Sequence, residues 1–163
     1  MVGDYKVITL CGSTRFRDAF MEVQKRLTLE GNIVISVGLF GHSGDKEVWE
    51  SMDEGILTRT KEMLDDMHKR KIDMADEIYV INVEGYIGES TKSEIEYATQ
   101  HRKPVRYLIH PFVGKRVRKK KNGEIHVITK VTQFEEDIFG QGNFAIDTDK
   151  GDYLYECEIE ILD

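Results

Sequence analysis

The chain has 163 residues, of which 40% are hydrophobic and 33% charged, and its formal net charge is −7 at pH 7. This length suits one domain, or one domain with a small appendage, and the composition allows a buried core. An acidic chain lacks the broad basic face that neutralises phosphates, which argues against a general nucleic-acid-binding protein. A small anionic ligand needs only a local pocket, and the net charge does not argue against it.

The polar N-terminus and the short apolar runs predict a cytoplasmic protein that does not bind membranes. Residues 1–6 are polar and lead directly into a strand, and no apolar run approaches the roughly 20 residues of a membrane span. Cys11 and Cys157 are far apart and are expected to be reduced thiols. Cys11 beside a glycine turn could be a nucleophile, but no histidine lies near it in the sequence. This favours a buried core cysteine.

Strands and helices alternate over the first 110 residues. Short apolar runs predict strands, and apolar residues spaced three or four positions apart predict helices. In chain order the predicted elements are a strand over 6–11, a helix over 16–30 closed by Gly31, a strand over 33–39, a glycine-rich loop over 40–45, a helix over 46–75, a strand over 77–83, a helix over 91–100 and a strand over 105–109. This alternation predicts an α/β fold with a doubly wound parallel sheet, Rossmann-like or flavodoxin-like.

The long predicted helix over 46–75 carries one apolar stripe at helical spacing, made of Met52, Ile56, Thr60, Met63 and Met67. A methionine stripe of this kind is typical of a side that faces the core, and we interpret it so. The five histidines of the chain are scattered and show no metal-ligand spacing. We therefore predict no metal and no organic cofactor.

The pattern changes after residue 110. The remaining segments are rich in β-forming residues, and Asn122-Gly123 favours a hairpin. We predict two domains, an α/β domain over 1–110 and an antiparallel β appendage over 111–163. The basic run over 115–121 is interpreted as a solvated hairpin tip rather than a binding patch.

The first candidate site follows the first predicted strand, where Gly12, Ser13, Thr14 and Arg15 precede a helix. Ligands of open α/β sheets bind beyond the carboxyl ends of the strands, and a helix N-terminus there offers free N–H groups to an anion. Two hydroxyls and the Arg15 guanidinium add further donors. The structural alternative is that Ser13 only caps the helix.

The second candidate site follows the third predicted strand and contains Gly88, Ser90, Thr91 and Glu94. A doubly wound sheet brings this segment next to the first site. A carboxylate kept ionised by the dipole of the helix could attack an anomeric carbon. The structural alternative is a capping box over 91–94, in which Glu94 reaches back to the start of the helix.

Together these segments resemble the nucleoside 2-deoxyribosyltransferase superfamily, which includes the deoxynucleoside monophosphate N-hydrolases. The matching segments, in order, are the turn over 12–15, the entry at 75–76 to an apolar strand, and the helix over 94–98 followed by 103–104. The resemblance covers about residues 6–110. It implies that Glu94 is the nucleophile that takes the sugar from the base, and that the turn lies against the sugar or its phosphate. It also implies a homo-oligomer, expected to be a dimer.

Some positions depart from the pattern of that superfamily. His68 stands where many relatives have an aspartate, Gly88 where transferases tend to carry one, and Thr9 where an aromatic residue is common. With Gly88 in place of the acid, Ser90 and Thr91 bring hydroxyls to the site, which makes this segment similar to the monophosphate hydrolases.

The resemblance thus implies cleavage or transfer at the N-glycosidic bond of a nucleoside or its 5′-monophosphate, with ribose or deoxyribose as the sugar. Glu94 would act as retaining glycosidases do, and His68 or Asp73 would protonate or hold the leaving base. The expected substrate-binding residues are Gly12, Ser13, Thr14, Arg15, Gly88, Ser90 and Thr91. Two alternatives remain open: a nucleotide sensor without catalysis, and an interaction protein whose β appendage carries the role.

Overall fold

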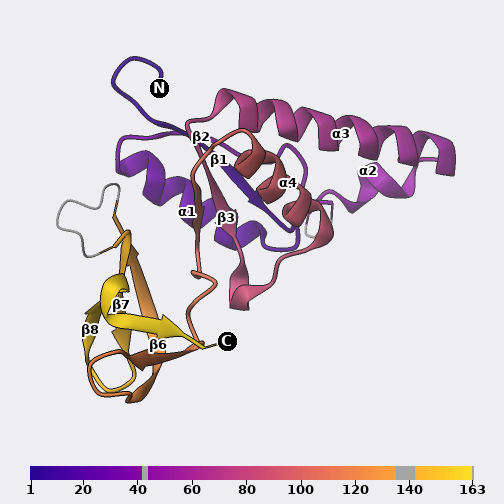
Figure 1. The fold of residues 1–163 in the computed structure, drawn as a ribbon. Coiled ribbons are helices and arrows are strands. Elements are labelled where there is room, and N and C mark those ends of the chain that lie inside the picture. The colour runs from indigo at the N-terminus through magenta and orange to yellow at the C-terminus, as the bar shows by residue number, and fades with distance from the viewer. Residues whose placement is uncertain (42–43, 135–141, 163) are drawn as a thin grey trace. The chain divides into compact units, whose positions relative to one another are not determined.

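The computed structural model describes residues 1–41, 44–134 and 142–162. The chain divides into two compact units, Met1–Ile109 and His110–Asp163. The first combines helices with a parallel sheet, and the second is built on an antiparallel sheet (Figure 1). Residues 42–43 of the loop predicted over 40–45 lie outside the described residues.

The first unit contains a parallel sheet in the strand order β2-β1-β3-β4. The strands are β1 (Val7–Gly12), β2 (Ile33–Ile35), β3 (Glu77–Ile81) and β4 (Val105–Tyr107). The two central strands, β1 and β3, are buried along nearly their whole length, as expected for parallel strands covered on both faces. The strand predicted over 33–39 is wrong in length, because the chain leaves the sheet after Ile35 and Val37 turns to line a cleft.

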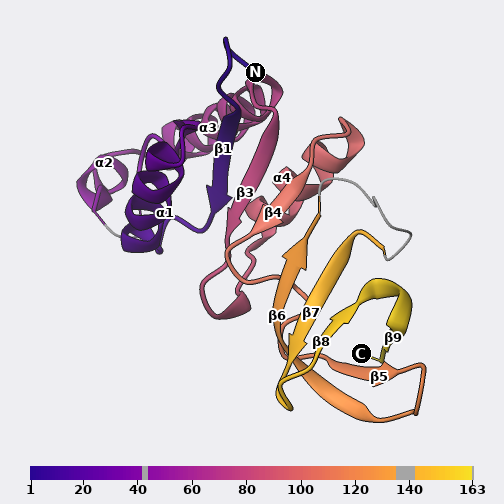
Figure 2. The ribbon, with the colours of Figure 1, turned by 90° about the vertical axis from the view of Figure 1, so that its left-hand side faces the viewer.

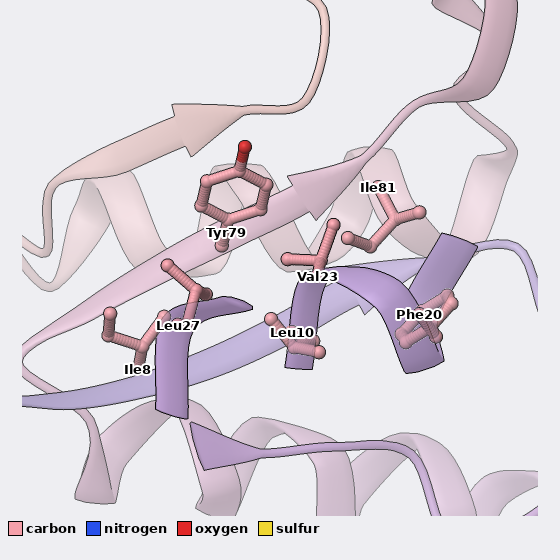
Figure 3. Close-up of a cluster of buried hydrophobic side chains, with 7 residues drawn as sticks. All are labelled: Ile8, Leu10, Phe20, Val23, Leu27, Tyr79 and Ile81. Atoms are coloured by element: carbon pink, nitrogen blue, oxygen red, sulfur yellow. The ribbon is translucent and has the colours of Figure 1, made fainter. Parts of the chain in front are cut away.

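Helices cover both faces of this sheet. They are α1 (Arg17–Leu29), α2 (Lys46–Glu50), α3 (Glu54–Met74), the short 3-10 helix η1 (Val83–Gly85) and α4 (Glu89–Gln100). On one face, α1 packs Phe20, Val23 and Leu27 against apolar side chains of β1 and β3 (Figure 3). On the other face, Ile72 of α3 and Ala98 of α4 pack against the same two strands. Figure 2 shows α1 on one side of β1 and β3 and α4 on the other.

The helix predicted over 46–75 is wrong, because the chain forms two helices there, α2 and α3. The side chain of Asp53 caps the second of them by accepting the N–H of Ile56 at 2.9 Å. A capping carboxylate satisfies an N–H that a helix start leaves free, and so it stabilises a new start within a segment of helical spacing.

The apolar stripe of α3 does not belong to the core. Ile56, Met63 and Met67 are 50%, 52% and 46% exposed. The buried residues of α3 are His68 and Ile72, one turn apart near its C-terminal end. Only that end reaches the sheet, while the rest of the helix extends beyond the strands (Figure 1).

The second unit is an antiparallel sheet in the strand order β8-β7-β6-β5-β9. Its elements are β5 (Arg116–Lys119), β6 (Ile125–Gln133), β7 (Phe144–Thr148), β8 (Tyr153–Tyr155), the 3-10 helix η2 (Glu156–Glu158) and β9 (Ile159–Ile161). The predicted hairpin at Asn122-Gly123 is confirmed, since Gly123 has a φ of +75° and donates its N–H to the Lys119 carbonyl at 2.8 Å. Along the described ranges of both units, no helix has the length and apolar character that crossing a membrane requires.

Candidate functional site

A cleft of about 660 Å³ lies in the first unit, at the carboxyl ends of its strands. Its walls come from the segments that follow β1, β2 and β3 and from parts of α2, α3 and α4. Open α/β sheets bind ligands at this edge, and the volume is within the range of small-molecule sites. The cleft is therefore the candidate functional site of the chain.

Most of the predicted site residues line this cleft, namely Gly12, Ser13, Thr14, Arg15, His68, Gly88, Ser90, Thr91 and Glu94. Asp73 does not. Its carboxylate pairs with Arg70 at 2.8 Å and accepts the Tyr97 hydroxyl at 2.8 Å. Asp73 lies five positions after His68 on the same helix, about 140° around its axis, so the two side chains leave α3 in different directions.

The turn after β1 places a cation beside an aromatic ring. The guanidinium carbon of Arg15 lies 4.5 Å from the centre of the Tyr86 ring, and Arg15 Nε donates to Ser13 Oγ at 3.1 Å. Ser13 is not the helix cap, because α1 has Phe16 as its N-cap without a side-chain cap hydrogen bond. The alternative that Ser13 only caps the helix is therefore wrong.

The neighbouring strand β3 leaves no room for a side chain at position 12. A Cβ at this position would lie 2.8 Å from the carbonyl oxygen of Ile81, its partner in the register of β1 and β3. The structure thus gives a packing reason for glycine at this position, which also lines the cleft. At the opposite end of these strands, Asp76 accepts the Val7 N–H at 2.7 Å, which ties β1 to the entry of β3 and places Asp76 outside the cleft.

Glu94 does not form the predicted capping box. Helix α4 begins at Glu89 with Gly88 as its N-cap, so Glu94 lies in the second turn. Its Oε1 is 3.8 Å from Nε2 of His68, and its side chain is 15% exposed. Its Oε2 is buried and has no hydrogen-bond partner among the described residues. The carboxyl group is thus part of the cleft wall, and its Oε2 is shielded from solvent.

Cys11 completes a buried cluster with these two residues. Its Sγ is 3.4 Å from His68 Nε2, and the polar atoms of Cys11, His68 and Glu94 all lie within 4.8 Å of one another. We did not predict this cluster, because 57 positions separate Cys11 from the histidine that it contacts. The signal in the sequence was the position of Cys11, which directly precedes the Gly12 turn at the end of a buried strand.

Burial keeps this cluster uncharged at neutral pH. It raises the pKa of Glu94 from 4.5 to about 8 and raises the pKa of Cys11 well above its usual value. It also lowers the pKa of His68 from 6.5 to about 4, to which the nearby Lys71 contributes. The expectation that the helix dipole keeps Glu94 ionised is therefore wrong, because the dipole acts within the first turn and Glu94 lies in the second.

The remaining walls of the cleft combine apolar groups with charges of both signs, and the acids among them are Glu50, Asp65 and Glu89. Trp49 of α2 and Tyr86 after β3 supply aromatic rings, and Lys46 and Lys61 supply positive charge. Lys71 also lines the cleft and donates its Nζ to the Ser36 carbonyl at 2.9 Å. Aromatic faces and cations of this kind suit a ligand with a planar ring and an anionic group.

The resemblance to the nucleoside 2-deoxyribosyltransferase superfamily is based on the sequence motifs described above and not on a match to a known protein. Nine of the ten predicted site residues lie together, and the role of each is argued from its position in the cleft. In comparisons with known proteins, no family model matches the chain, and neither a curated protein nor a solved structure matches it.

Proposed function

We propose that the first unit is a doubly wound, Rossmann-like domain that cleaves or transfers at the N-glycosidic bond of a nucleoside or its 5′-monophosphate. The nucleophile in this proposal is Glu94. The observation that carries it is the buried carboxyl group of Glu94, which has one unpartnered oxygen and lines a cleft of about 660 Å³ beside the turn over 12–15. A carboxylate beside the sugar is the group that retaining glycosidases use as nucleophile.

The surroundings of Glu94 suit the other parts of such a substrate. Arg15, the Ser13 hydroxyl in the turn before α1 and Ser90 in the first turn of α4 offer donors to a phosphate. Trp49 and Tyr86 offer rings against which a base can stack. The sugar would then lie between the phosphate and base positions, over Glu94.

The proton on Glu94 must move before attack, and His68 is placed to take it. The pKa values of the two groups, about 8 and about 4, differ by about 4, which corresponds to about 5 kcal/mol for this transfer. The charges that result lie 3.8 Å apart and attract each other by about 4 kcal/mol at an effective dielectric constant of 20. This attraction offsets most of the cost of the transfer, so the ion-pair form is accessible to the reaction.

The proposed reaction starts from this ion-pair form. The Glu94 carboxylate attacks C1′ of the sugar, the C1′–N bond breaks, and its electron pair leaves with the base. The base takes the proton from the His68 imidazolium. Water, or a second base, then attacks C1′ and releases Glu94, and His68 takes the proton that the attacking group loses.

The test is to incubate the protein with a panel of nucleosides and 5′-monophosphates and to measure free base by chromatography. Glu94→Gln is expected to lower base release by about 10⁴-fold or more, as for enzymes that lose their nucleophile. Glu96→Gln is the matched control, because Glu96 is exposed on the same helix. Glu94 and Glu96 are two positions apart, which places their side chains about 200° apart around the helix axis. Glu94 lines the cleft, and Glu96 therefore points away from it. Base release at the normal rate by the Glu94→Gln protein would refute the mechanism.

The raised pKa of Glu94 supports a second candidate function, a nucleotide sensor without catalysis. A Glu94 carboxyl group that is uncharged at neutral pH suits binding without attack. In that case the wild-type protein binds members of the same panel but releases no base. Calorimetric titration beside the chromatographic assay separates the two functions.

A further inference from the structure

Cys11, His68 and Glu94 offer three different donor atoms to one point in space. The thiol sulfur lies 3.4 Å from the imidazole nitrogen, and that nitrogen lies 3.8 Å from the nearer carboxyl oxygen of Glu94. All three atoms are within 4.8 Å of one another. We propose that these residues bind one Zn²⁺ ion, with a fourth position that faces the cleft.

The distances agree with the geometry that zinc requires. Zinc binds sulfur at about 2.3 Å, and nitrogen and oxygen at about 2.0–2.2 Å. Tetrahedral angles then place sulfur and nitrogen about 3.6 Å apart, and nitrogen and oxygen about 3.4 Å apart. The distances of 3.4 Å and 3.8 Å in the chain differ from these by a few tenths of an ångström. The Glu94 carboxyl group can make this shift, since its Oε2 has no hydrogen-bond partner among the described residues.

The types of donor favour zinc over the common hard cations. Magnesium and calcium prefer sites made of oxygen atoms, whereas thiolate sulfur, imidazole nitrogen and carboxylate oxygen are all donors that zinc binds. The charges also balance, because the thiolate of Cys11 and the carboxylate of Glu94 neutralise a divalent ion. A neutral assembly can be buried without the cost of an isolated charge.

The surroundings supply a supporting hydrogen bond and a way in. The His68 ring is hydrogen-bonded to the backbone of Leu10, and such bonds hold the imidazoles of metal sites in place. Cys11 is fully buried, but His68 and Glu94 both line the cleft, so an ion can reach the cluster from that side. A bound ion would have three protein ligands and one position open to the cleft, which is the pattern of catalytic rather than structural zinc sites.

The experiment uses the full chain, reduced and freed of metal with a chelator, and titrates it with Co²⁺ as a spectroscopic substitute for zinc. We expect uptake of one ion per chain, an intense visible spectrum typical of tetrahedral Co²⁺, and a near-ultraviolet band from thiolate coordination. Zn²⁺ should displace the cobalt. No nucleotide is present, so the result is independent of the proposed function.

Variants assign the ligands. Cys11→Ser is expected to abolish the thiolate band, whereas Cys157→Ser, the matched control at the exposed cysteine, should leave it unchanged. His68→Gln and Glu94→Gln should each weaken cobalt binding by more than the roughly 10–100-fold that outer-shell changes cause. Circular dichroism establishes that each variant is folded, and should Cys11→Ser not fold, the other two variants decide. The proposal is overturned if wild-type protein takes up no cobalt at micromolar concentration, if the thiolate band survives in Cys11→Ser, or if both other variants bind as tightly as wild type.

Discussion

The free energy of unfolding of the wild-type chain is expected to fall between about pH 6.5 and about pH 8, because Glu94 loses its proton there. Glutamine at this position does not ionise, so Glu94→Gln should abolish this pH dependence. The pKa of Glu94 is 4.5 in an ordinary environment and about 8 in the fold, so the folded state binds this proton more tightly. The stability that it contributes is fully present below pH 4.5 and is lost as the pH rises to about 8.

His68 acts in the opposite direction over a lower range of pH. Its pKa is 6.5 in an ordinary environment and about 4 in the fold, so its contribution is present above pH 6.5 and is lost as the pH falls to about 4. Each group changes the free energy of unfolding by about 1.4 kcal/mol per pH unit. Between pH 4.5 and pH 6.5 the two slopes cancel, and above pH 6.5 Glu94 acts alone. The remaining interval of about 1.5 pH units corresponds to a loss of about 2 kcal/mol.

Urea unfolding between pH 6 and pH 8.5 measures this loss. The single tryptophan, Trp49, lies in the first unit, so its fluorescence reports on the unit that contains Glu94. The free energy of unfolding of wild type and of the control Glu96→Gln should fall by about 2 kcal/mol between pH 6.5 and pH 8, whereas that of Glu94→Gln should not change. A Glu94→Gln protein that loses as much stability as wild type would show that Glu94 is not the titrating group, and the reasoning from burial would fail.

Two further predictions concern the ligand and the assembly. Arg15→Ala should weaken the binding of a 5′-monophosphate by about 1.5–3 kcal/mol, the range for hydrogen bonds to charged groups, and leave nucleoside binding unchanged. Calorimetry measures both affinities, and Arg17→Ala is the control, because Arg17 is not among the residues that line the cleft. Equal binding of nucleoside and monophosphate by wild type contradicts the prediction. The exposed Ile56 and Met63 of α3 support the expected dimer. Sedimentation should show a dimer of the wild-type chain and a monomer after both residues are replaced by serine. A lone 18.8 kDa species of wild type at micromolar concentration rules the dimer out.

The elements that could be predicted from the sequence are those that local signals determine. The apolar run of β1 ends at Gly12. Helix α1 ends at Leu29 and is followed by Gly31, whose φ is +88° and whose N–H bonds to the Thr28 carbonyl at 3.0 Å. The change of pattern after residue 110 also agrees with the boundary along the chain between the units Met1–Ile109 and His110–Asp163. The two loops of the cleft could be placed at one sheet edge because parallel strands bring their carboxyl ends together.

The remaining features depend on contacts between distant residues. The break between α2 and α3 needs the cap formed by Asp53, and spacing alone does not distinguish this from a continuous helix. The capping box over 91–94 matched a local pattern, but α4 begins two residues earlier, at Glu89. Whether a methionine stripe is buried depends on how far α3 extends beyond the sheet. None of these follows from the order of residues in one segment.

The chemistry of the cluster depends on which residue stands beside Glu94. An aspartate in place of His68, as in many members of the superfamily that the chain resembles, would put two acids together, and their repulsion would raise the pKa of one of them. Histidine can instead accept the proton of Glu94, because the attraction between the two charges offsets most of the cost of the transfer. It also adds a nitrogen donor 3.4 Å from the sulfur of Cys11. His68 thus leaves Glu94 available to a sugar carbon in the proposed reaction and to a metal ion in the proposed zinc site. Because one carboxylate cannot serve both at once, zinc bound at this cluster would block any attack by Glu94, and the fraction of chains that carry zinc would set the fraction able to react.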